Sequence, residues 1–510
     1  MFIIWRYSLD NGKIPHKFLQ QTIVPIFKKG NKSDPGNYRP VSLTSHLIKV
    51  FERVLRVKLI TFIETNNILS TDQYGFRSGR SCVTQLISHF ENIYNILEDE
   101  GNADVILLDF SRAFDKVDHE ILLEKLKSFG ITGKLHKWLE CFLSGRSQQV
   151  VIEGHKSNSE PVQSGVPQGT VLGPLLFILY INDITTVIKN SYIKIFADDS
   201  KLIKAIKSLQ DRELLNADLQ ATMEWAIQNK MELNRLKFQL IHHGKCDSLK
   251  LSYTIDNDTT IEASQHVRDL GVTVSADSTF REHIQNITKK AKMQAAWILR
   301  TVTSRTAEVV MLLYKTYVRP CLEYACALWS PHLIRDIAQL ESIQRSVTAK
   351  IERLEHMNYW ERLIHLELYS LQRRRERYQI IHIHKICTGI IPNDIGLSFY
   401  NTPRYGIRCR VPIRNSYRSA ASIRNNSFSV KGPLLYNSIP PSIKACASFD
   451  TFKLHLDTFL RSIPDNPPIP NYCRMNSNSV TEWLSGHLDN RFINTATEGG
   501  ARTGARPHFH

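Results

Sequence analysis

Three aspartates occupy positions from which they could act together on one chemical group. Asp198 and Asp199 are adjacent within a mostly apolar stretch from Tyr192 to Ile203, and Asp109 follows the apolar run Val105 to Leu108. Carboxylate oxygens are ligands that Mg²⁺ prefers, and two such ions stabilise the attacking and leaving oxygens of an in-line phosphoryl displacement. The three aspartates therefore predict a site of metal-assisted phosphoryl transfer.

The flanking residues predict how these aspartates are carried. Apolar residues on both sides of Asp198 and Asp199 are typical of two short antiparallel strands with the acidic pair at the turn. The run from Asp104 to Asp109 indicates a buried strand whose last side chain emerges at a sheet edge. An Asp-Asp pair alone more often just caps a turn. The functional interpretation therefore depends on the rest of the chain.

A loop between the two acidic segments, Ser164 to Thr170, is the next candidate. Its glycines and proline allow a backbone to approach a flat partner closely, and the amide of Gln168 can hydrogen-bond a nucleotide. The same residues could form an ordinary turn. The position of this loop, directly before a long apolar helix and between two acidic sites, favours the functional interpretation.

Together these segments resemble the palm of a reverse transcriptase. The resemblance extends from about residue 14 to about residue 460 and points to polymerases of non-LTR, LINE-type retrotransposons of the jockey-like branch. It implies an α+β right-hand polymerase, with fingers, a palm built on an antiparallel sheet, a helical thumb and a mostly helical C-terminal extension. The matching segments are Val24 to Lys29, Asn37 to Leu43, Gln73 to Arg77, Asp109 to Asp115, Ser164 to Phe177, Phe196 to Asp199 and Asn234 to Lys237.

The resemblance also implies roles for individual residues. Asp109, Asp198 and Asp199 would bind two Mg²⁺ ions, with Mn²⁺ as an alternative, and the backbone carbonyl of Phe110 would be a further ligand. Phe114, five residues after Asp109, would lie beneath the sugar of the incoming nucleotide and exclude a 2′-hydroxyl. The product would then be DNA.

Further residues match the nucleotide site of that family. Arg39 and one of Lys28 or Lys29 would neutralise the triphosphate, a task that suits the arginine fork and the lysine point charge. Gln168 and Gly169 would contact the nucleotide. Lys237 matches a motif lysine that could protonate departing pyrophosphate. After that lysine the sequence departs from the usual family pattern.

Each of these residues also has a simpler interpretation. Phe114 taken alone would more often be a core aromatic, and Arg39 a surface residue. Asp115 or Asp118 is expected to cap a helix from Ile121 to Phe129, and neither is assigned any chemistry. The offset of Phe114 from Asp109 favours its functional interpretation.

The composition agrees with a polymerase. The 510 residues are 42% hydrophobic, enough for a full core, and the formal net charge of +16 predicts an anionic partner. The expected partners are an RNA template, a DNA primer or nicked target DNA, and dNTPs. From Arg345 to Asn425 there are fifteen Lys or Arg against six Asp or Glu, so over half of the excess charge lies there. Its arginines could follow a phosphate backbone, although any single one of them would more often lie on a solvated face. They are Arg373, Arg374, Arg375, Arg377, Arg404, Arg408, Arg410, Arg414 and Arg418.

Cysteine spacing and hydropathy predict where the protein acts. Nine scattered cysteines show no zinc-binding spacing and indicate a reducing compartment. The apolar stretch Val171 to Ile181 is too short to span a bilayer, and Met1 to Trp5 is too short for a signal peptide. We therefore expect an intracellular protein, in the nucleus and/or cytoplasm, that is not secreted and has no membrane partner.

These landmarks predict an order of domains. Arg268 to Val272 resembles the hairpin that holds a primer end, and helical spacing from Ile284 to Ile298 predicts an amphipathic helix with a basic face. A second helix is expected to end before Pro320. The predicted regions are fingers at 1–100, palm at 101–245 within a reverse transcriptase domain of about 14–275, primer hairpin and thumb at 246–345, a basic region at 346–463 and a disordered tail at 464–510.

Two other functions are weighed against an active reverse transcriptase. An RNA-dependent RNA polymerase is disfavoured by Phe114 and by Ala197, rather than glycine, before the acidic pair. A catalytically inactive relic that only binds nucleic acid remains open, although no motif is broken. Complete elements of this kind resemble fusions of an upstream endonuclease to the polymerase, whereas this sequence starts about where the fingers are expected to begin. The endonuclease is therefore expected to be lacking, and the nicking activity to come from another protein.

Overall fold

The computed structural model describes residues 2–99, 101–244, 252–256, 259–403, 405–412, 420–469 and 478–487. Contacts between Cα atoms divide the chain into two compact units, residues 1–85 with 99–270 and residues 86–98 with 271–510. Residues 86–98, which were expected in the fingers, thus belong to the second unit. The other boundaries expected from the sequence stay predictions.

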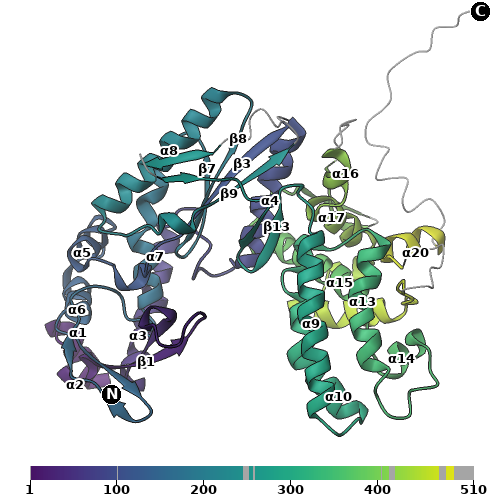
Figure 1. Cartoon of the computed structure of the whole chain (residues 1–510), viewed down its shortest axis with the longest axis horizontal. Coiled ribbons are helices and arrows are strands. Elements are labelled where there is room, and N and C mark those ends of the chain that lie inside the picture. The colour runs from purple at the N-terminus through teal and green to yellow at the C-terminus, as the bar shows by residue number, and fades with distance from the viewer. Residues whose placement is uncertain are drawn as a thin grey trace, which may run out of the picture. The chain divides into compact units, whose positions relative to one another are not determined.

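The first unit is built around a four-stranded antiparallel sheet with the strand order β7–β8–β3–β9. Its strands are β3 (Asn102–Leu108), β7 (Tyr192–Phe196), β8 (Asp199–Ala205) and β9 (Gln239–Gly244). Helix α8 (Leu209–Gln228) packs against β8, as Figure 1 shows. The run Val105 to Leu108 forms the last part of β3, so the buried strand before Asp109 is confirmed.

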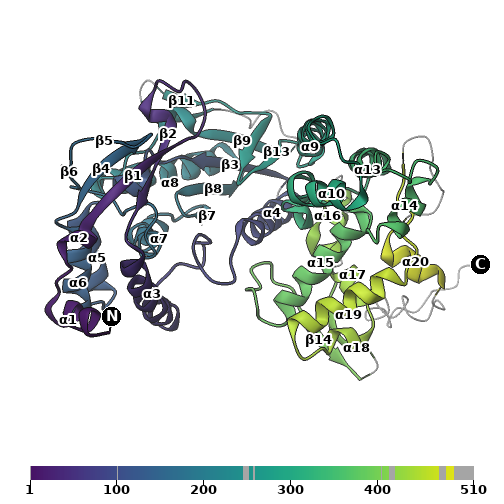
Figure 2. The ribbon, with the colours of Figure 1, turned by 90° about the horizontal axis from the view of Figure 1, so that it is seen from below.

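A second sheet in this unit has the order β2–β1–β4–β5, with β6 paired to β4 (Figure 2). Strands β1 and β2 are antiparallel, whereas β1 and β4 are parallel. The strands are β1 (Gln20–Phe27), β2 (Tyr38–Leu43), β4 (Ser147–Ile152), β5 (His155–Lys156) and β6 (Glu160–Pro161). Shorter strands follow at β10 (Tyr253–Asp256), β11 (Thr259–Ile261) and β12 (His266–Asp269).

Helix α7 (Gly173–Tyr180) lies in the hydrophobic core of the first unit. The apolar stretch noted in the sequence is therefore a core helix, which explains its lack of polar residues. The helix expected at 121–129 is α5 (His119–Ser128); Asp118 caps it by accepting N–H bonds from the first turn. The remaining helices are α1 (Phe2–Asn11), α2 (His16–Leu19), α3 (His46–Thr65) and α6 (Gly133–Leu143), and α4 (Cys82–Asp99) belongs mostly to the second unit.

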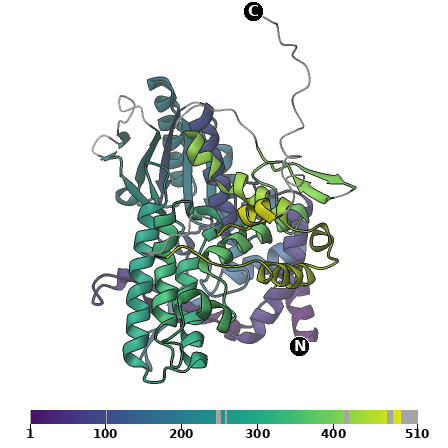
Figure 3. The same cartoon turned by 90° about the vertical axis from the view of Figure 1, so that its right-hand side faces the viewer.

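The second unit is mainly helical. Helices α9 (Arg281–Thr301) and α13 (Ile334–Thr348) lie side by side in Figures 1 and 3. On α9, Ile284 and Ile298 are buried, whereas Lys289, Lys290 and Lys292 are exposed, which confirms the amphipathic basic helix. The other elements up to residue 409 are β13 (Val272–Ser275), α10 (Ala307–Leu313), α11 (Arg319–Glu323), α12 (Cys326–Trp329), α14 (Tyr359–His365), α15 (Leu371–Cys387), β14 (Phe399–Thr402) and β15 (Gly406–Cys409).

The expectation that a helix ends before Pro320 is wrong. Helix α10 continues through a π-helical turn, Tyr314–Val318, into α11, which contains Pro320 in its first turn. Proline is tolerated at that position because the N–H it lacks would have no partner within the new helix. The wider π turn carries the chain past the point where proline would break a regular helix.

The C-terminal part confirms one expectation and corrects another. The short helix expected near 449–460 is α19 (Phe449–Arg461). The tail expected to be disordered includes α20 (Val480–His487), whose Val480 and Leu484 are buried, so that expectation fails for 478–487. The tail residues 470–477 and 488–510 lie outside the described part of the chain. The other helices here are α16 (Ala420–Asn425), α17 (Phe428–Ser438) and α18 (Pro441–Lys444).

Among the residues that the structure describes, no helix combines the length and the apolar character needed to cross a bilayer.

Candidate active site

The predicted metal-binding aspartates come from neighbouring strands of the β7–β8–β3–β9 sheet. Leu108 in β3 lies opposite Ser200 in β8. Continuing this antiparallel register by one residue sets Asp109 opposite Asp199. Residues 109 and 199 are 90 positions apart in the chain, and the sheet brings them to one edge.

The turn that carries the acidic pair is strained and supported from outside. Ala197 has a φ of 56°, an uncommon value for a residue with a side chain, and it precedes Asp198 and Asp199. Its N–H donates to Oε1 of the buried Gln73 at 3.0 Å, and the N–H of Gly75 donates to the same oxygen at 2.7 Å. A Cβ on Gly75 would lie 2.4 Å from the Ala197 nitrogen, so only glycine fits there. The segment around Gln73 thus fixes the turn.

Negative charge accumulates at this edge. Burial, followed by the negative charge of Asp109, raises the pKa of Asp198. Burial, followed by the charge of Asp198, raises the pKa of Asp199 to about 6, although this side chain still reaches solvent. Asp269 and Asp109 act on Asp199 in the same direction, whereas the ammonium of Lys201 opposes them. Carboxylates that disfavour one another's ionisation suit a cation, which would relieve their repulsion.

Lys237 lies at the same edge. Leu107 in β3 pairs with Gln239 at the start of β9, and Lys237 ends the 3₁₀ turn Arg235–Lys237 just before that strand. The ammonium of Lys237 donates to Oδ2 of Asp109 at 2.8 Å, and both side chains are partly exposed. Among the described residues, no three His, Cys, Asp or Glu side chains are gathered closely enough to hold a metal ion. Lys237 supplies the compensating charge for Asp109 in this arrangement.

The register of the β1–β2 pair distinguishes Lys28 from Lys29. Ile26 lies opposite Arg39, and the backbone pairing continues to Lys28. Because side chains alternate along a strand, Lys28 shares the face of Arg39, while Lys29 lies in a bend beyond the paired residues. The positive charges of Arg39 and Lys28 both act to lower the pKa of Asp198. The arrangement therefore associates Arg39 and Lys28, rather than Lys29, with the acidic site.

Phe114 combines features of a core residue and a surface residue. It lies in a short 3₁₀ turn, Ala113–Asp115, and is half-buried. Its ring stacks on that of the fully buried Phe177 in α7, with centroids 4.1 Å apart, and Phe76 meets it edge-on at 6.1 Å. The core contact fixes the orientation of the ring and leaves part of it accessible.

Gln168 is held at both its backbone and its side chain. The backbone carbonyl accepts the N–H of Ser42 at 2.7 Å, and Nε2 donates to Oδ1 of Asp115 at 3.0 Å. Gly169 has a φ of 126°, and a Cβ there would lie 2.4 Å from the carbonyl oxygen of Ser42. The close approach anticipated for the loop is therefore made to the protein's own strand β2.

Asp115 is a site residue that sequence reasoning missed. It was expected to do no more than cap α5, but Asp118 is the cap. Burial raises the pKa of Asp115, and its hydrogen bond with Gln168 opposes that change. Ser164 also donates to the backbone carbonyl of Asp115 at 2.9 Å. The adjacency of Asp115 to Phe114 is the one sequence signal that could have indicated this role.

Phe110, whose carbonyl was expected to be a metal ligand, directly follows Asp109. Its side chain is buried and packs edge-on against Trp225, with centroids 6.4 Å apart. The N–H of Asn234 donates to the carbonyl of Asp109 at 2.8 Å, which fixes the backbone beside it. The role of the Phe110 carbonyl stays a prediction.

The expectation that the arginine run of α15 follows a phosphate backbone is wrong for its four members. Arg373 and Arg375 are fully buried. Arg373 donates to the carbonyls of Leu460, Pro464 and Asn478 at 3.1 to 3.3 Å. The guanidinium group of Arg373 therefore joins α15 to the C-terminal segments.

The other two arginines of this run form ion pairs. Arg374 pairs with Glu323 at 3.0 Å, and Arg377 pairs with Asp457 at 2.7 Å. Arg408 is also buried, and Arg410 is exposed. The other three arginines expected to bind phosphate, Arg404, Arg414 and Arg418, lie outside the described residues.

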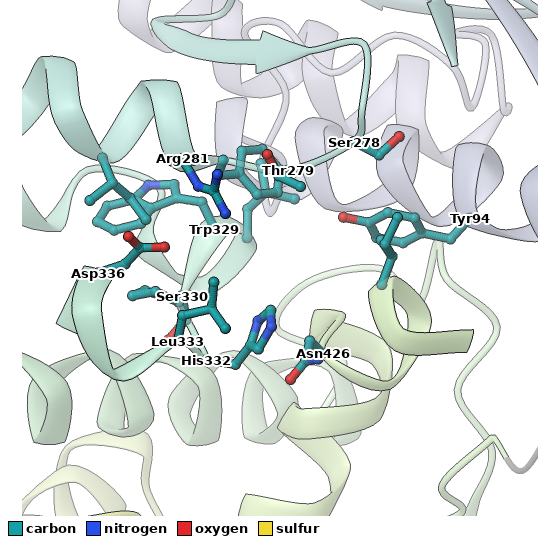
Figure 4. Close-up of a pocket in the computed structure, with 15 residues that line it drawn as sticks. Tyr94, Ser278, Thr279, Arg281, Trp329, Ser330, His332, Leu333, Asp336 and Asn426 are labelled. Atoms are coloured by element: carbon teal, nitrogen blue, oxygen red, sulfur yellow. The ribbon is translucent and has the colours of Figure 1, made fainter. Parts of the chain in front are cut away.

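The second unit contains a cavity of about 100 Å³ (Figure 4). Arg281, Trp329, His332 and Asp336 are among the side chains that border it, and Tyr94 contributes from α4. None of the residues predicted for catalysis lines this cavity.

Comparison with known proteins gives a family match that overlaps most of the first unit. Residues 26–274 match the family described as reverse transcriptase (RNA-dependent DNA polymerase). The chain is 29% identical over 345 residues to the RNA-directed DNA polymerase from mobile element jockey of Drosophila melanogaster, covering 64% of the chain and 37% of that protein. It is 28% identical over 353 residues to the probable RNA-directed DNA polymerase from transposon X-element of the same organism, covering 67% and 38%.

A solved structure also resembles the chain. Telomerase from Candida tropicalis, in complex with a fragment of telomeric RNA, aligns with a TM-score of 0.43 and 11% identity, covering 90% of this chain and 66% of that one. The chain spans less than two fifths of the length of the two curated relatives.

Proposed function

Because this chain belongs to the reverse transcriptases of non-LTR retrotransposons, with a matching domain at residues 26–274, we propose that it extends the 3′-hydroxyl of a DNA primer along an RNA template. The register of the β7–β8–β3–β9 sheet carries the proposal. It supports a site in which Asp109 and Asp199 share one edge, with Asp198 at the adjoining turn, and the ion pair between Lys237 and Asp109 adds Lys237 beside them.

A reverse transcriptase domain generally implies the use of divalent metal ions. We propose two Mg²⁺ ions, with Mn²⁺ as an alternative, held by Asp109, Asp198, Asp199 and the carbonyl of Phe110. The fit is supported by the hard oxygen donors and by the raised pKa of Asp198 and Asp199, which a cation would reverse. When bound, such ions stabilise the attacking and leaving oxygens of the displacement.

The remaining residues bind and orient the nucleotide. Arg39 and Lys28 neutralise the triphosphate, a role supported by their shared strand face and by their effect on Asp198. Gln168 contacts the nucleotide from the position that Asp115 and Ser42 fix, and Gly169 lets the loop approach β2. Phe114 lies beneath the sugar and excludes a 2′-hydroxyl.

Lys237 has two tasks in this proposal. Its ammonium compensates the charge of Asp109. During the reaction its ammonium donates a proton to the departing pyrophosphate. The substrates would be an RNA template, a DNA primer or nicked target DNA, and dNTPs. Nucleic-acid substrates of this kind are found inside the cell, in the nucleus and/or cytoplasm.

Primer extension tests the proposal. We expect the parent chain to extend oligo(dT) on poly(rA) with Mg²⁺, and Asp198→Asn to lower the rate by ~10²-fold or more, because preorganised charge at a reaction centre has effects of this size. Asp10→Asn, an exposed aspartate on α1, is the matched control and should retain the parental rate.

Two outcomes would contradict the proposal. Retained activity in Asp198→Asn would overturn the metal assignment. No extension by the parent, with binding to the RNA:DNA hybrid intact in a gel shift, would favour a protein that only binds nucleic acid.

A further inference from the structure

A buried carboxylate on α3 has a place that hydrophobic packing does not explain. Glu52 is fully buried, and the described part of the chain contains no ion pair to it. Burying a charge costs free energy unless specific partners compensate it, and an apolar side chain would fill the same space without that cost. Glu52 therefore calls for a reason other than packing.

The partners of this carboxylate are the backbone donors at the start of α7. Oε2 of Glu52 accepts the N–H of Val171 at 2.7 Å and the N–H of Leu172 at 2.9 Å. The first N–H groups of a helix have no partner within the helix, and the helix dipole favours negative charge there. The next donor, the N–H of Gly173, is taken by Oγ1 of Thr170 at 3.1 Å. Glu52 thus completes the cap of α7 from another segment of the chain.

Burial raises the pKa of Glu52, and the N–H groups of Leu172 and Val171 oppose that change. Arg146 and Lys49 act in the same direction as these donors. The two backbone hydrogen bonds are thus the main influence that favours the ionised form of Glu52.

These bonds fix the loop that carries Gln168. Gln168 lies three residues before Val171, and its backbone carbonyl accepts the N–H of Ser42. The loop is therefore attached at two points to the segment formed by β2 and α3. The same segment carries Arg39, whose charge acts on Asp198.

We propose that Glu52 is a positioning residue for nucleotide binding, which holds the Gln168 loop in register with the strand that bears Arg39. The inference rests on the proposed polymerase function. It predicts that loss of the carboxylate weakens dNTP binding while leaving the grip on the primer and template unchanged. A merely structural cap would lower stability and leave the dNTP KM of the folded enzyme unchanged.

Asp218 provides a matched control in the same unit. It is a buried carboxylate on α8 that accepts the N–H of Lys189 at 3.1 Å and the N–H of Asn190 at 2.8 Å. It therefore resembles Glu52 in burial and in its backbone partners, and it contacts a different loop.

The test compares Glu52→Leu, Glu52→Gln and Asp218→Leu as full chains. In Glu52→Leu we expect faster amide hydrogen exchange in a peptide covering residues 164–176 and a dNTP KM raised by ~10-fold to ~100-fold, the scale of small misplacements at a reacting site. Affinity for the RNA:DNA hybrid should not change. Glu52→Gln should restore both values, because its carbonyl oxygen can accept the same bonds. Asp218→Leu should quicken exchange near residue 190 and leave the dNTP KM unchanged.

The inference is overturned if exchange or the dNTP KM is unchanged in Glu52→Leu, or if Asp218→Leu raises the KM equally. Should the parent extend no primer, the proposed function fails by itself. Equilibrium binding of dNTP to the hybrid-bound chain then replaces the KM, and unchanged affinity in Glu52→Leu would overturn the inference on its own.

Discussion

Two groups of charged residues in this molecule differ in what surrounds them. At the edge of the β7–β8–β3–β9 sheet, Asp198 and Asp199 lie within reach of like charge, and their pKa values are raised by burial and by the neighbouring carboxylates. In α15, Arg373 is buried against backbone carbonyls and Arg377 is paired with Asp457. The first group holds charge that still needs a partner, whereas the second has its partners within the fold.

The difference shows which kind of charge indicates function. Like charges that are brought together cost stability, so their presence requires a ligand or a reaction to account for it. Opposite charges that pair with each other need no ligand or reaction to explain their presence. The +9 balance between residues 345 and 425 is thus poor evidence for a nucleic-acid surface, because much of it lies on buried guanidinium groups.

Arg373→Ala gives the strongest test of this contrast. We expect a loss of about 3 to 5 kcal/mol in the free energy of unfolding, since removing one partner of a buried ionic network leaves the others unpaired. Guanidinium denaturation measures this loss. The exposed Arg410→Ala, from the same basic region, should stay within about 0.5 kcal/mol of the parent. If folded Arg373→Ala bound the RNA:DNA hybrid more weakly and kept the parental stability, Arg373 would bind nucleic acid instead of stabilising the fold.

The parts of the site that depend on local periodicity could be predicted from the sequence. The apolar run before Asp109 and the apolar residues around the acidic pair define a strand and a hairpin without any long-range information. The basic helix α9 was predicted for the same reason, because its buried and exposed positions repeat at helical spacing.

The rest depends on contacts between residues far apart in the chain. The partner of Arg377 lies 80 positions away, so no local pattern distinguishes this arginine from an exposed one. The choice between Lys28 and Lys29 requires the β1–β2 register, and the role of Asp115 requires its bond to Gln168. The helix through Pro320 needed a π turn that propensity alone does not indicate.

Glu341→Gln tests the buried charges of the second unit through the pH dependence of the free energy of unfolding. Burial raises the pKa of Glu341 to about 7, and the charge of Arg375 is the main opposing influence. Between pH 4.5, the ordinary pKa of glutamate, and pH 7, the folded chain therefore holds a proton that the unfolded chain releases, so stability falls as pH rises. The fall is on the order of 3 kcal/mol. Denaturation from pH 4 to 8 should show it in the parent and lack it in Glu341→Gln. The exposed Glu355→Gln should keep the parental slope; a Glu341→Gln profile equal to the parent's would refute this account.

Lys290→Ala should have the smallest effect and would show where the anionic partner binds. Lys290 is exposed on α9, beside Lys289 and Lys292, so its removal should leave thermal stability unchanged. If this helix lies along the template and primer duplex, the logarithmic salt dependence of hybrid affinity should decrease by about one, as expected for the loss of one phosphate contact. Folded Arg373→Ala should keep the parental salt dependence. The opposite result, a slope lowered by Arg373→Ala and unaffected by Lys290→Ala, would mean that burial does not distinguish structural from ligand-binding charge in this chain.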